Sequence, residues 1–341
     1  MLRILAIRGN TALPNPTATD LPALLGDPEV RVWVDLAGSS DETIERILNK
    51  IFRFHPLAVE DCLAERERPK LETFDGYIYS ITHGIGRGSD AEEHEVVELD
   101  AFLGARFLVT YHAKESRSVD SIFELAGRTI ESHHRSPAAL LQAVLDRQVD
   151  GIEPLLDDFE RRLETLEERV LARPMKEDLA SLVAFRRNLI HLRRWLGLQR
   201  DVVLRLSRNE ANLFSAQDAI LFRDTHDHLA RCTEFLETYR EITNTIQEAA
   251  LSVINNRLGE NMKFLTLFSA VLMPLSLLAG IYGMNFQRMP GLDSPYGFPL
   301  IVLTMVATAG GVLLFFRRKG WLGQGPRPPV EPAKPGDPPK V

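Results

Sequence analysis

Tyr282-Gly283-Met284-Asn285 lies near the end of residues 264–287, a run of 24 residues without a charged side chain. Residues 294–316 form a second uncharged run, of 23 residues. A helix needs roughly 20 apolar residues to cross about 30 Å of hydrocarbon, so both runs are long enough to span a bilayer. The segment between them, predicted as a loop at 287–298, contains Gly and Pro. The two spans are therefore expected to form a hairpin, with the tetrapeptide at the mouth where the first span ends.

The charges that flank this hairpin predict its orientation. We place the first transmembrane helix at about 264–284 and the second at 299–317. Five basic side chains bracket the outer ends of the hairpin: Arg257, Lys263, Arg317, Arg318 and Lys319. The connecting loop has Arg288 as its basic residue. Because Lys and Arg accumulate on the cytoplasmic side, we expect a multi-pass protein of the cell (inner) membrane with both termini in the cytoplasm.

The rest of the chain is acidic. The formal net charge is −7, but residues 257–340 contain nine Lys or Arg and four Asp or Glu, so residues 1–256 carry about −12. Nucleic-acid binding requires clustered positive charge, and we therefore expect no nucleic-acid partner. An acidic body suits divalent cations. The two cysteines, Cys62 and Cys232, match no metal-ligand or redox spacing.

Short apolar runs and one helical pattern predict an α/β cytoplasmic domain over residues 1–135. The helical pattern covers Asp41 to Phe52. The strand-like runs are Leu2 to Ile7, Val30 to Leu36, Tyr77 to Thr82, Val96 to Leu103 and Phe107 to Tyr111. Mixed helix and strand signals of this kind are typical of an α/β fold.

From residue 136 onward the pattern is helical. Residues 136–212 predict an amphipathic helical pair, Leu140 to Val170 and Lys176 to Leu206, separated at Arg173-Pro174. Residues 213–286 predict one long stalk helix that continues into the first span. At 1.5 Å per residue this helix would be about 105 Å long, which is long enough to link the cytoplasmic part to the membrane. The Pro-rich tail 323–341 is expected to be disordered.

A stripe of small, polar or sulfur-containing residues follows one face of the first span. Steps of three and four residues join its members: Met262, Thr266, Ser269, Met273, Ser276, Gly280 and Gly283. The same register passes back through Asn255 and Glu248. Small residues also support close helix packing in membranes, so the stripe by itself fits either packing or a pore. Two helices enclose no lumen, and a pore would need several copies of this span.

Several of these motifs resemble the CorA family of magnesium and cobalt transport proteins. Around the membrane they are Gly283-Met284-Asn285-Phe286, Met289-Pro290, Asn256-Arg257-Leu258, Met262-Lys263, Leu265-Thr266, Met273-Pro274-Leu275 and the closing Arg317-Arg318-Lys319-Gly320-Trp321-Leu322. In the cytoplasmic part they are His55-Pro56-Leu57, Glu60-Asp61, Arg68-Pro69-Lys70 and Phe222-Arg223-Asp224 with His228. The resemblance covers nearly the whole chain except the tail.

The resemblance implies a pentameric funnel in which five copies of the first span line a pore. Gly283, Met284 and Asn285 would form the outer selectivity filter, and Met262 with Leu265 or Thr266 a hydrophobic constriction. Neutral amide oxygens suit the water shell of a small hard cation, although Asn285 also fits a helix C-cap. Two positions depart from the family pattern. Gly259 stands where many members have an inner-pore Asn, and the acidic residue usual after Met289-Pro290 is missing, with Asp293 as a partial substitute.

The resemblance also implies regulatory cation sites between neighbouring subunits. The matching residues are Glu60, Asp61, Asp224, Asp227 and His228. Asp224 and His228 are four residues apart and share one helix face. Without the resemblance, these charges read as ordinary solvated helix residues.

The sequence thus predicts a homopentameric divalent cation channel in a lipid bilayer. Mg²⁺ is the expected transported and regulatory ion, with Co²⁺ or Ni²⁺ as further substrates. No combination of nucleophile, base and orienting group is recognisable, so no enzyme activity is expected. A zinc carrier of the related ZntB type and a non-conducting, membrane-anchored cation sensor are the alternatives. The stripe offers neither His nor Cys, the ligands that zinc favours.

Overall fold

The computed structural model describes residues 1–321 except 10, 65–67, 88–93, 129–135 and 285–293. The chain forms two compact units. The first consists of Met1–Leu166 with Ala180–Asn244, and the second of Glu167–Leu179 with the chain from Thr245 onward. Asn285, the following residues to Asp293 and the tail 323–341 lie outside the described residues.

Among the described residues, seven strands form one mixed sheet in the order β2-β1-β3-β7-β6-β5-β4. The strands are β1 (Leu2–Arg8), β2 (Thr11–Ala12), β3 (Val30–Ala37), β4 (Lys70–Phe74), β5 (Tyr77–Arg87), β6 (His94–Gly104) and β7 (Phe107–His112). β3 and β7 pair in parallel, and the other neighbours are antiparallel. β3 is buried on both faces from Val32 to Leu36, as expected of a central strand covered on both sides.

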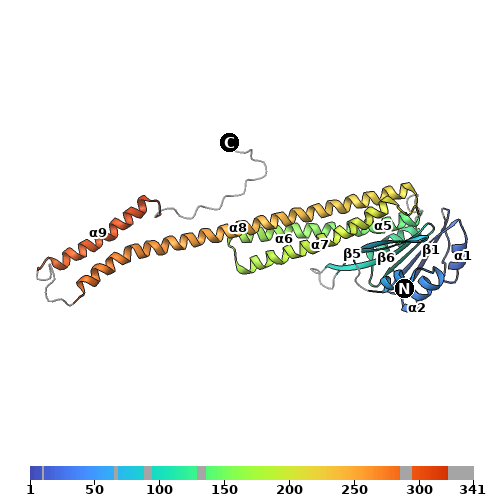
Figure 1. Cartoon of the computed structure of the whole chain (residues 1–341), viewed down its shortest axis with the longest axis horizontal. Coiled ribbons are helices and arrows are strands. Elements are labelled where there is room, and N and C mark those ends of the chain that lie inside the picture. Colours follow the sequence, from blue (N-terminus) through green and yellow to red (C-terminus); the bar gives the residue numbers. More distant parts are fainter. Residues whose placement is uncertain (10, 65–67, 88–93, 129–135, 285–293, 322–341) are drawn as a thin grey trace, which may run out of the picture. The chain divides into compact units, whose positions relative to one another are not determined.

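Different helices cover the two faces of this sheet (Figure 1). On one face, Phe102 and Tyr79 pack with residues of α1 (Leu21–Gly26), α2 (Asp41–Glu45), the π-helical segment η1 (Arg46–Ile51) and α3 (Pro56–Leu63). The other face is covered by α4 (Arg117–Arg128) and α5 (Pro137–Asp150). There the ring centroid of Trp33 lies 4.9 Å from that of Phe123 on α4. The predicted α/β domain is therefore a three-layer arrangement.

The structure divides the predicted Leu140 to Val170 run into two helices. α5 ends at Asp150, and α6 (Glu153–Ala172) begins after Gly151 and the buried Ile152. Pro154 lies in the first turn of α6, where its missing N–H costs no helical hydrogen bond. The expected break at Arg173-Pro174 separates α6 from α7 (Lys176–Arg208).

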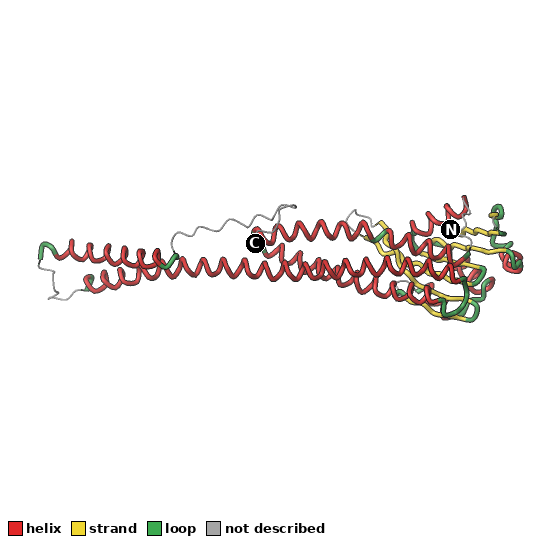
Figure 2. The backbone as a smooth tube through the Cα atoms, turned by 90° about the horizontal axis from the view of Figure 1, so that it is seen from above, coloured by secondary structure: helices red, strands yellow, loops and turns green. Residues whose placement is uncertain are grey.

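In the first unit, α6, α7 and the beginning of α8 run side by side (Figures 1 and 2). The rings of Phe159 on α6 and Phe185 on α7 meet at 5.4 Å. Arg193 of α7 forms a 2.6 Å ion pair with Glu237 of α8. Apolar side chains of the three helices are buried, among them Leu163, Leu189 and Leu236, as the helical periodicity predicted.

α8 (Ala216–Tyr282) is one continuous helix of 67 residues, and α9 (Gly297–Arg318) has 22. The last part of α8 and all of α9 are long and apolar enough to cross a membrane, and no residue of their most apolar windows is buried. Pro274 lies inside α8. Proline removes one helical hydrogen bond, which transmembrane helices tolerate. The expected stalk helix and second apolar helix are both present.

Candidate functional site

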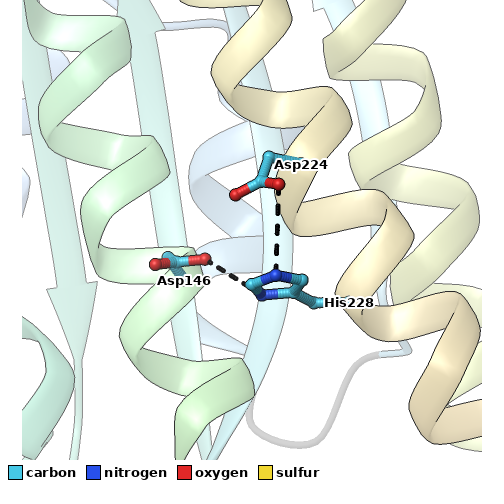
Figure 3. Close-up of side chains that lie close together, drawn as sticks. All are labelled: Asp146, Asp224 and His228. Carbon is cyan, nitrogen blue, oxygen red and sulfur yellow. Dashed lines mark ion pairs between the residues drawn. The ribbon is translucent and has the colours of Figure 1, made fainter.

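Three side chains of types that can ligate a metal ion meet in the first unit, between α5 and α8 (Figure 3). Asp146 comes from α5, and Asp224 and His228 come from successive turns of α8. Nδ1 of His228 lies 3.7 Å from Oδ1 of Asp146, and Nε2 lies 4.0 Å from Oδ1 of Asp224. One ligand atom from each residue lies within 4.8 Å of the other two. We call this group the cation cluster.

Hydrogen bonds hold the Asp146 side of the cation cluster in place. The hydroxyl of Thr225 donates to Oδ1 of Asp146 at 3.4 Å, and the amide of Gln142 donates to Thr225 at 3.0 Å. Thr225 itself is fully buried. It follows Asp224 in the chain, so the contact that fixes α5 against α8 also fixes the spacing of the two carboxylates.

The electrostatics of the cation cluster favour a positive partner. Burial raises the pKa of Asp146 above its ordinary value, and the carboxylates of Asp150 and Asp224 raise it further, while the imidazole of His228 opposes the shift. A carboxylate whose ionised form is disfavoured by neighbouring carboxylates gains stability when a cation binds. Asp224 is largely exposed, at 70% for its side chain, so a bound cation would retain part of its water shell.

The cation cluster contains two of the five residues predicted for regulatory cation binding. Asp227 lies outside it, with a side chain that is 68% exposed and 3.1 Å from Nδ1 of His226. Glu60 and Asp61 lie on α3, where Asp61 pairs with Lys70 at 2.5 Å. Their approach to Asp224 of a neighbouring subunit stays a prediction.

Asp146 was not predicted as a ligand. Its signal in the sequence is small: it is the first charged residue after the largely apolar stretch Pro137 to Leu145. Its position next to Asp224 arises from the packing of α5 on α8, which periodicity within α5 does not reveal.

In the second unit, the predicted stripe lies on one face of α8. All of its members are exposed, as are Glu248, Asn255, Gly259 and Leu265. The half-buried positions within the predicted span fall on the opposite face: Leu267, Ala270, Val271, Pro274, Leu275 and Leu278. Thr266 donates its hydroxyl hydrogen to the Met262 carbonyl at 2.7 Å, so this donor is satisfied within the helix. The face that carries the polar and small residues is thus uncovered in the single chain.

The predicted filter begins where α8 ends. The N–H of Gly283 donates to the carbonyl of Ala279 at 2.9 Å, and that of Met284 to Ile281 at 3.4 Å. A Cβ atom at Gly283 would lie 2.9 Å from the Ala279 carbonyl oxygen, closer than real Cβ contacts come. Glycine is therefore required for this helix end.

Known proteins match this chain over residues of both units. The family model described as CorA-like Mg²⁺ transporter protein matches residues 29–318. The chain belongs to this family. Among CorA-like relatives, it is 33% identical over 292 residues to the putative metal ion transporter YfjQ of Bacillus subtilis, covering 85% of this chain and 89% of that protein.

Two further matches also cover most of the chain. The cobalt/magnesium transport protein CorA of Thermotoga maritima is 30% identical over 308 residues, covering 89% of this chain and 88% of that protein. The complete structure of the CorA magnesium transporter from Methanocaldococcus jannaschii superposes with a TM-score of 0.77 at 23% identity, over 94% of this chain and 98% of that one. More distantly, the zinc transport protein ZntB of Pectobacterium carotovorum is 24% identical over 271 residues. The expected family is confirmed, and so is the expected fold of an α/β domain, a long helix and a second apolar helix.

Proposed function

We propose that this chain is the subunit of a homopentameric channel that conducts Mg²⁺, with Co²⁺ or Ni²⁺ as further ions, across the cell membrane. The observation that carries the proposal is the uncovered stripe from Met262 to Gly283. Small residues on this face let copies of the helix approach one another closely, whereas the bulky residues of the other faces suit lipid. Several copies arranged with their stripes inward would enclose a water path, and the number five comes from the family resemblance.

The ions would move partly hydrated and down their electrochemical gradient. The membrane potential contributes about 2.3 kcal/mol per unit charge per 100 mV, so this chain needs no hydrolysis to drive entry. Asn285 would present a ring of amides at the outer mouth. Neutral oxygens bind the water shell of Mg²⁺ firmly enough to select it, yet allow it to leave.

We further propose that cytoplasmic Mg²⁺ closes this channel at the cation cluster, with Asp61 and Glu60 of a neighbouring subunit completing the site. Mg²⁺ prefers oxygen ligands and retains several waters, which fits two partly exposed carboxylates. Removing the ion would leave like charges together and loosen the subunit interface. A sensor of millimolar Mg²⁺ contributes only a few kcal/mol per assembly, which keeps the gate reversible.

Zinc transport is the second candidate function, and His228 is the observation that favours it. An imidazole ligand suits Zn²⁺, Co²⁺ and Ni²⁺ better than Mg²⁺. ZntB-type relatives in the family point the same way. Against zinc, the described part of the stripe contains neither His nor Cys.

Ion-by-ion flux into liposomes tests these proposals. Purified full-length protein should have a mass near five chains in mild detergent and should conduct Mg²⁺, measured beside Co²⁺, Ni²⁺ and Zn²⁺. A monomer or dimer would contradict the pore. Zn²⁺ flux without Mg²⁺ flux would favour the zinc carrier. Cation binding without any flux would identify a non-conducting sensor.

A further inference from the structure

A cavity of about 490 Å³ lies in the first unit, on the face of the sheet covered by α4 and α5. Strands β5 and β6 form its floor through Gly84 and Val97. The start of α4, the end of α5 and the start of α6 form its walls. None of these residues belongs to the cation cluster or to the membrane helices. The cavity is therefore separate from the sites proposed above.

Gln148 is a buried polar residue that lines this cavity. Its side chain is on α5, and the residue is only 2% exposed. Neither its Nε2 nor its Oε1 has a hydrogen-bond partner among the described residues. A Cβ atom at Gly84 would come within 3.2 Å of Cγ of Gln148, so the glycine leaves the space that the amide occupies. Buried amides are normally hydrogen-bonded, which indicates that a polar partner enters the cavity.

The N-terminus of α4 supplies a positive end to the same cavity. α4 has 12 residues, and its first N–H groups lack acceptors within the helix. The buried hydroxyls of Ser116 and Ser118 lie there, 3.1 Å apart, and Arg117 begins the helix. Helix N-termini with hydroxyl and guanidinium groups bind phosphate and similar anions.

The carboxylates around the cavity leave this positive end available. Asp120 in the first turn of α4 pairs with Arg3 at 2.7 Å. Asp150 pairs with Arg147 at 3.3 Å, so these two charges largely cancel. Glu115 is exposed and screened by solvent. Arg117, the helix N-terminus and the Gln148 amide remain to bind an anion.

We propose that this cavity binds a small organic phosphate, with the phosphoryl group at the N-terminus of α4. A bare phosphate ion is much smaller than the cavity, whose volume falls in the range of about 300–1,000 Å³ typical of small-molecule sites. A neighbouring cavity of about 460 Å³ shares Ser121, Arg147 and Asp150 with it and adds room for an organic part, and this second cavity extends to Asp146 of the cation cluster. The Gln148 amide can donate to a phosphoryl or hydroxyl oxygen and accept from a hydroxyl or amino group.

Isothermal titration of the full-length protein in Mg²⁺-free detergent solution tests this proposal. The probes are adenosine 5′-monophosphate, ribose 5-phosphate, inorganic phosphate and, without a phosphate, adenosine. We expect one or both organic phosphates to bind more tightly than inorganic phosphate, and adenosine not to bind. Arg117→Gln should weaken binding by about tenfold or more, the usual effect of losing a charged hydrogen bond. Arg208→Gln, an exposed arginine at the end of α7, is the matched control and should bind as wild type.

Gln148→Leu separates a ligand-binding amide from a packing residue. The substitution removes a buried amide without partners, so the melting temperature should be unchanged or higher while affinity for the organic phosphate falls by about tenfold. If this variant fails to fold, Arg117→Gln decides by itself, because that side chain is exposed. The proposal is overturned if no organic phosphate binds at millimolar concentration, if inorganic phosphate binds equally well, or if Arg117→Gln binds as wild type.

Discussion

Asp61 accepts a 2.5 Å hydrogen bond from the ammonium group of Lys70, so this carboxylate already has a cationic partner within its own subunit. The two side chains are 31% and 26% exposed. A divalent cation that bridges Asp61 to a neighbouring subunit must compete with Lys70 for the same oxygen atoms. Lys70 would thereby set the cation concentration at which the proposed sensor responds.

Lys70→Met should make the sensor more sensitive to Mg²⁺. Because the ion pair is partly exposed, its loss is worth at most about 1 kcal/mol, and the Mg²⁺ concentration at the midpoint of protection should fall about two- to fivefold. The measurement is limited proteolysis near the stalk over a Mg²⁺ titration. Lys70→Arg keeps the charge and should stay near the wild-type midpoint. An unchanged midpoint in Lys70→Met would mean that Asp61 is not a ligand.

Asp146→Asn should weaken Mg²⁺ protection by about tenfold or more, because it removes one charged ligand while preserving the shape of the side chain. Asp227→Asn is the matched control: it lies on α8 next to His228 but outside the cation cluster. Proteolysis and flux should depend on Mg²⁺ in this control as they do in wild type. Equal Mg²⁺ dependence of proteolysis and flux in the two variants would show that the cation cluster does not sense Mg²⁺.

Asp224→Lys should hold the interface closed without Mg²⁺. An ammonium group at this position would face Asp61 of the neighbouring subunit and replace the cation. We expect resistance to proteolysis and low flux in metal-free buffer, whereas Asp224→Ala and Asp61→Ala should lose protection at all Mg²⁺ concentrations that protect wild type. Mg²⁺-dependent flux like that of wild type in all three variants would place the sensor elsewhere.

Acidification should weaken Mg²⁺ binding at the cation cluster. The pKa of Asp146 is raised by burial and by Asp150, so a proton competes with the cation at pH values above the ordinary aspartate pKa of about 4. In metal-free protein the folded state binds this proton more tightly than the unfolded state. The contribution of Asp146 to stability is therefore lost as pH rises from about 4 through the raised pKa.

Melting temperatures of wild type and Asp146→Asn, compared across this pH range, test the sign. Without Mg²⁺, the melting temperature of wild type should rise relative to that of Asp146→Asn as pH falls. At neutral pH, a given Mg²⁺ concentration should raise the melting temperature of wild type more than that of Asp146→Asn. A wild-type advantage in metal-free buffer that grows with rising pH would contradict the direction of the shift.

Gly283→Ala should disrupt the end of α8. The added Cβ would meet the Ala279 carbonyl oxygen at 2.9 Å, which forces the closing hydrogen bond to move at a cost of about 1–3 kcal/mol. We expect lower thermal stability of the oligomer and reduced flux. Gly311→Ala in α9, where a Cβ has nothing within 4 Å, is the control and should resemble wild type. Equal stability of the two variants would show that the helix end tolerates a side chain.

Local patterns predicted the elements whose signals are long or regular. The alternation of Val30 to Leu36 and the absence of Gly and Pro between Ser215 and Gly259 anticipated β3 and most of α8. β4 was missed because Lys70–Phe74 is short and carries two charges. The break at Gly151 was missed because an isolated glycine is tolerated within helices.

The residues of the candidate sites also differ in whether a local pattern predicts them. Asp224 and His228 share a helix face, a relationship that a four-residue spacing expresses. Asp146 joins them through the packing of α5 on α8, and the orphaned amide of Gln148 is visible only when β5, α4 and α5 are assembled. Contacts between segments remote in sequence have no counterpart in a local pattern.

Asn285→Ala should abolish or deregulate Mg²⁺ flux without changing the mass of the oligomer, if the amide selects the ion. Asn285 lies outside the described residues, so its role rests on its place after Gly283-Met284. Asn285→Asp is the sharper variant. A ring of carboxylates would bind the cation more tightly and release it more slowly, giving Mg²⁺ block at lower concentration together with lower maximal flux. Asn256→Ala, an exposed amide on the same helix, is the control and should conduct normally. Wild-type flux and ion preference in both Asn285 variants would show that this amide only caps the helix and does not select the ion.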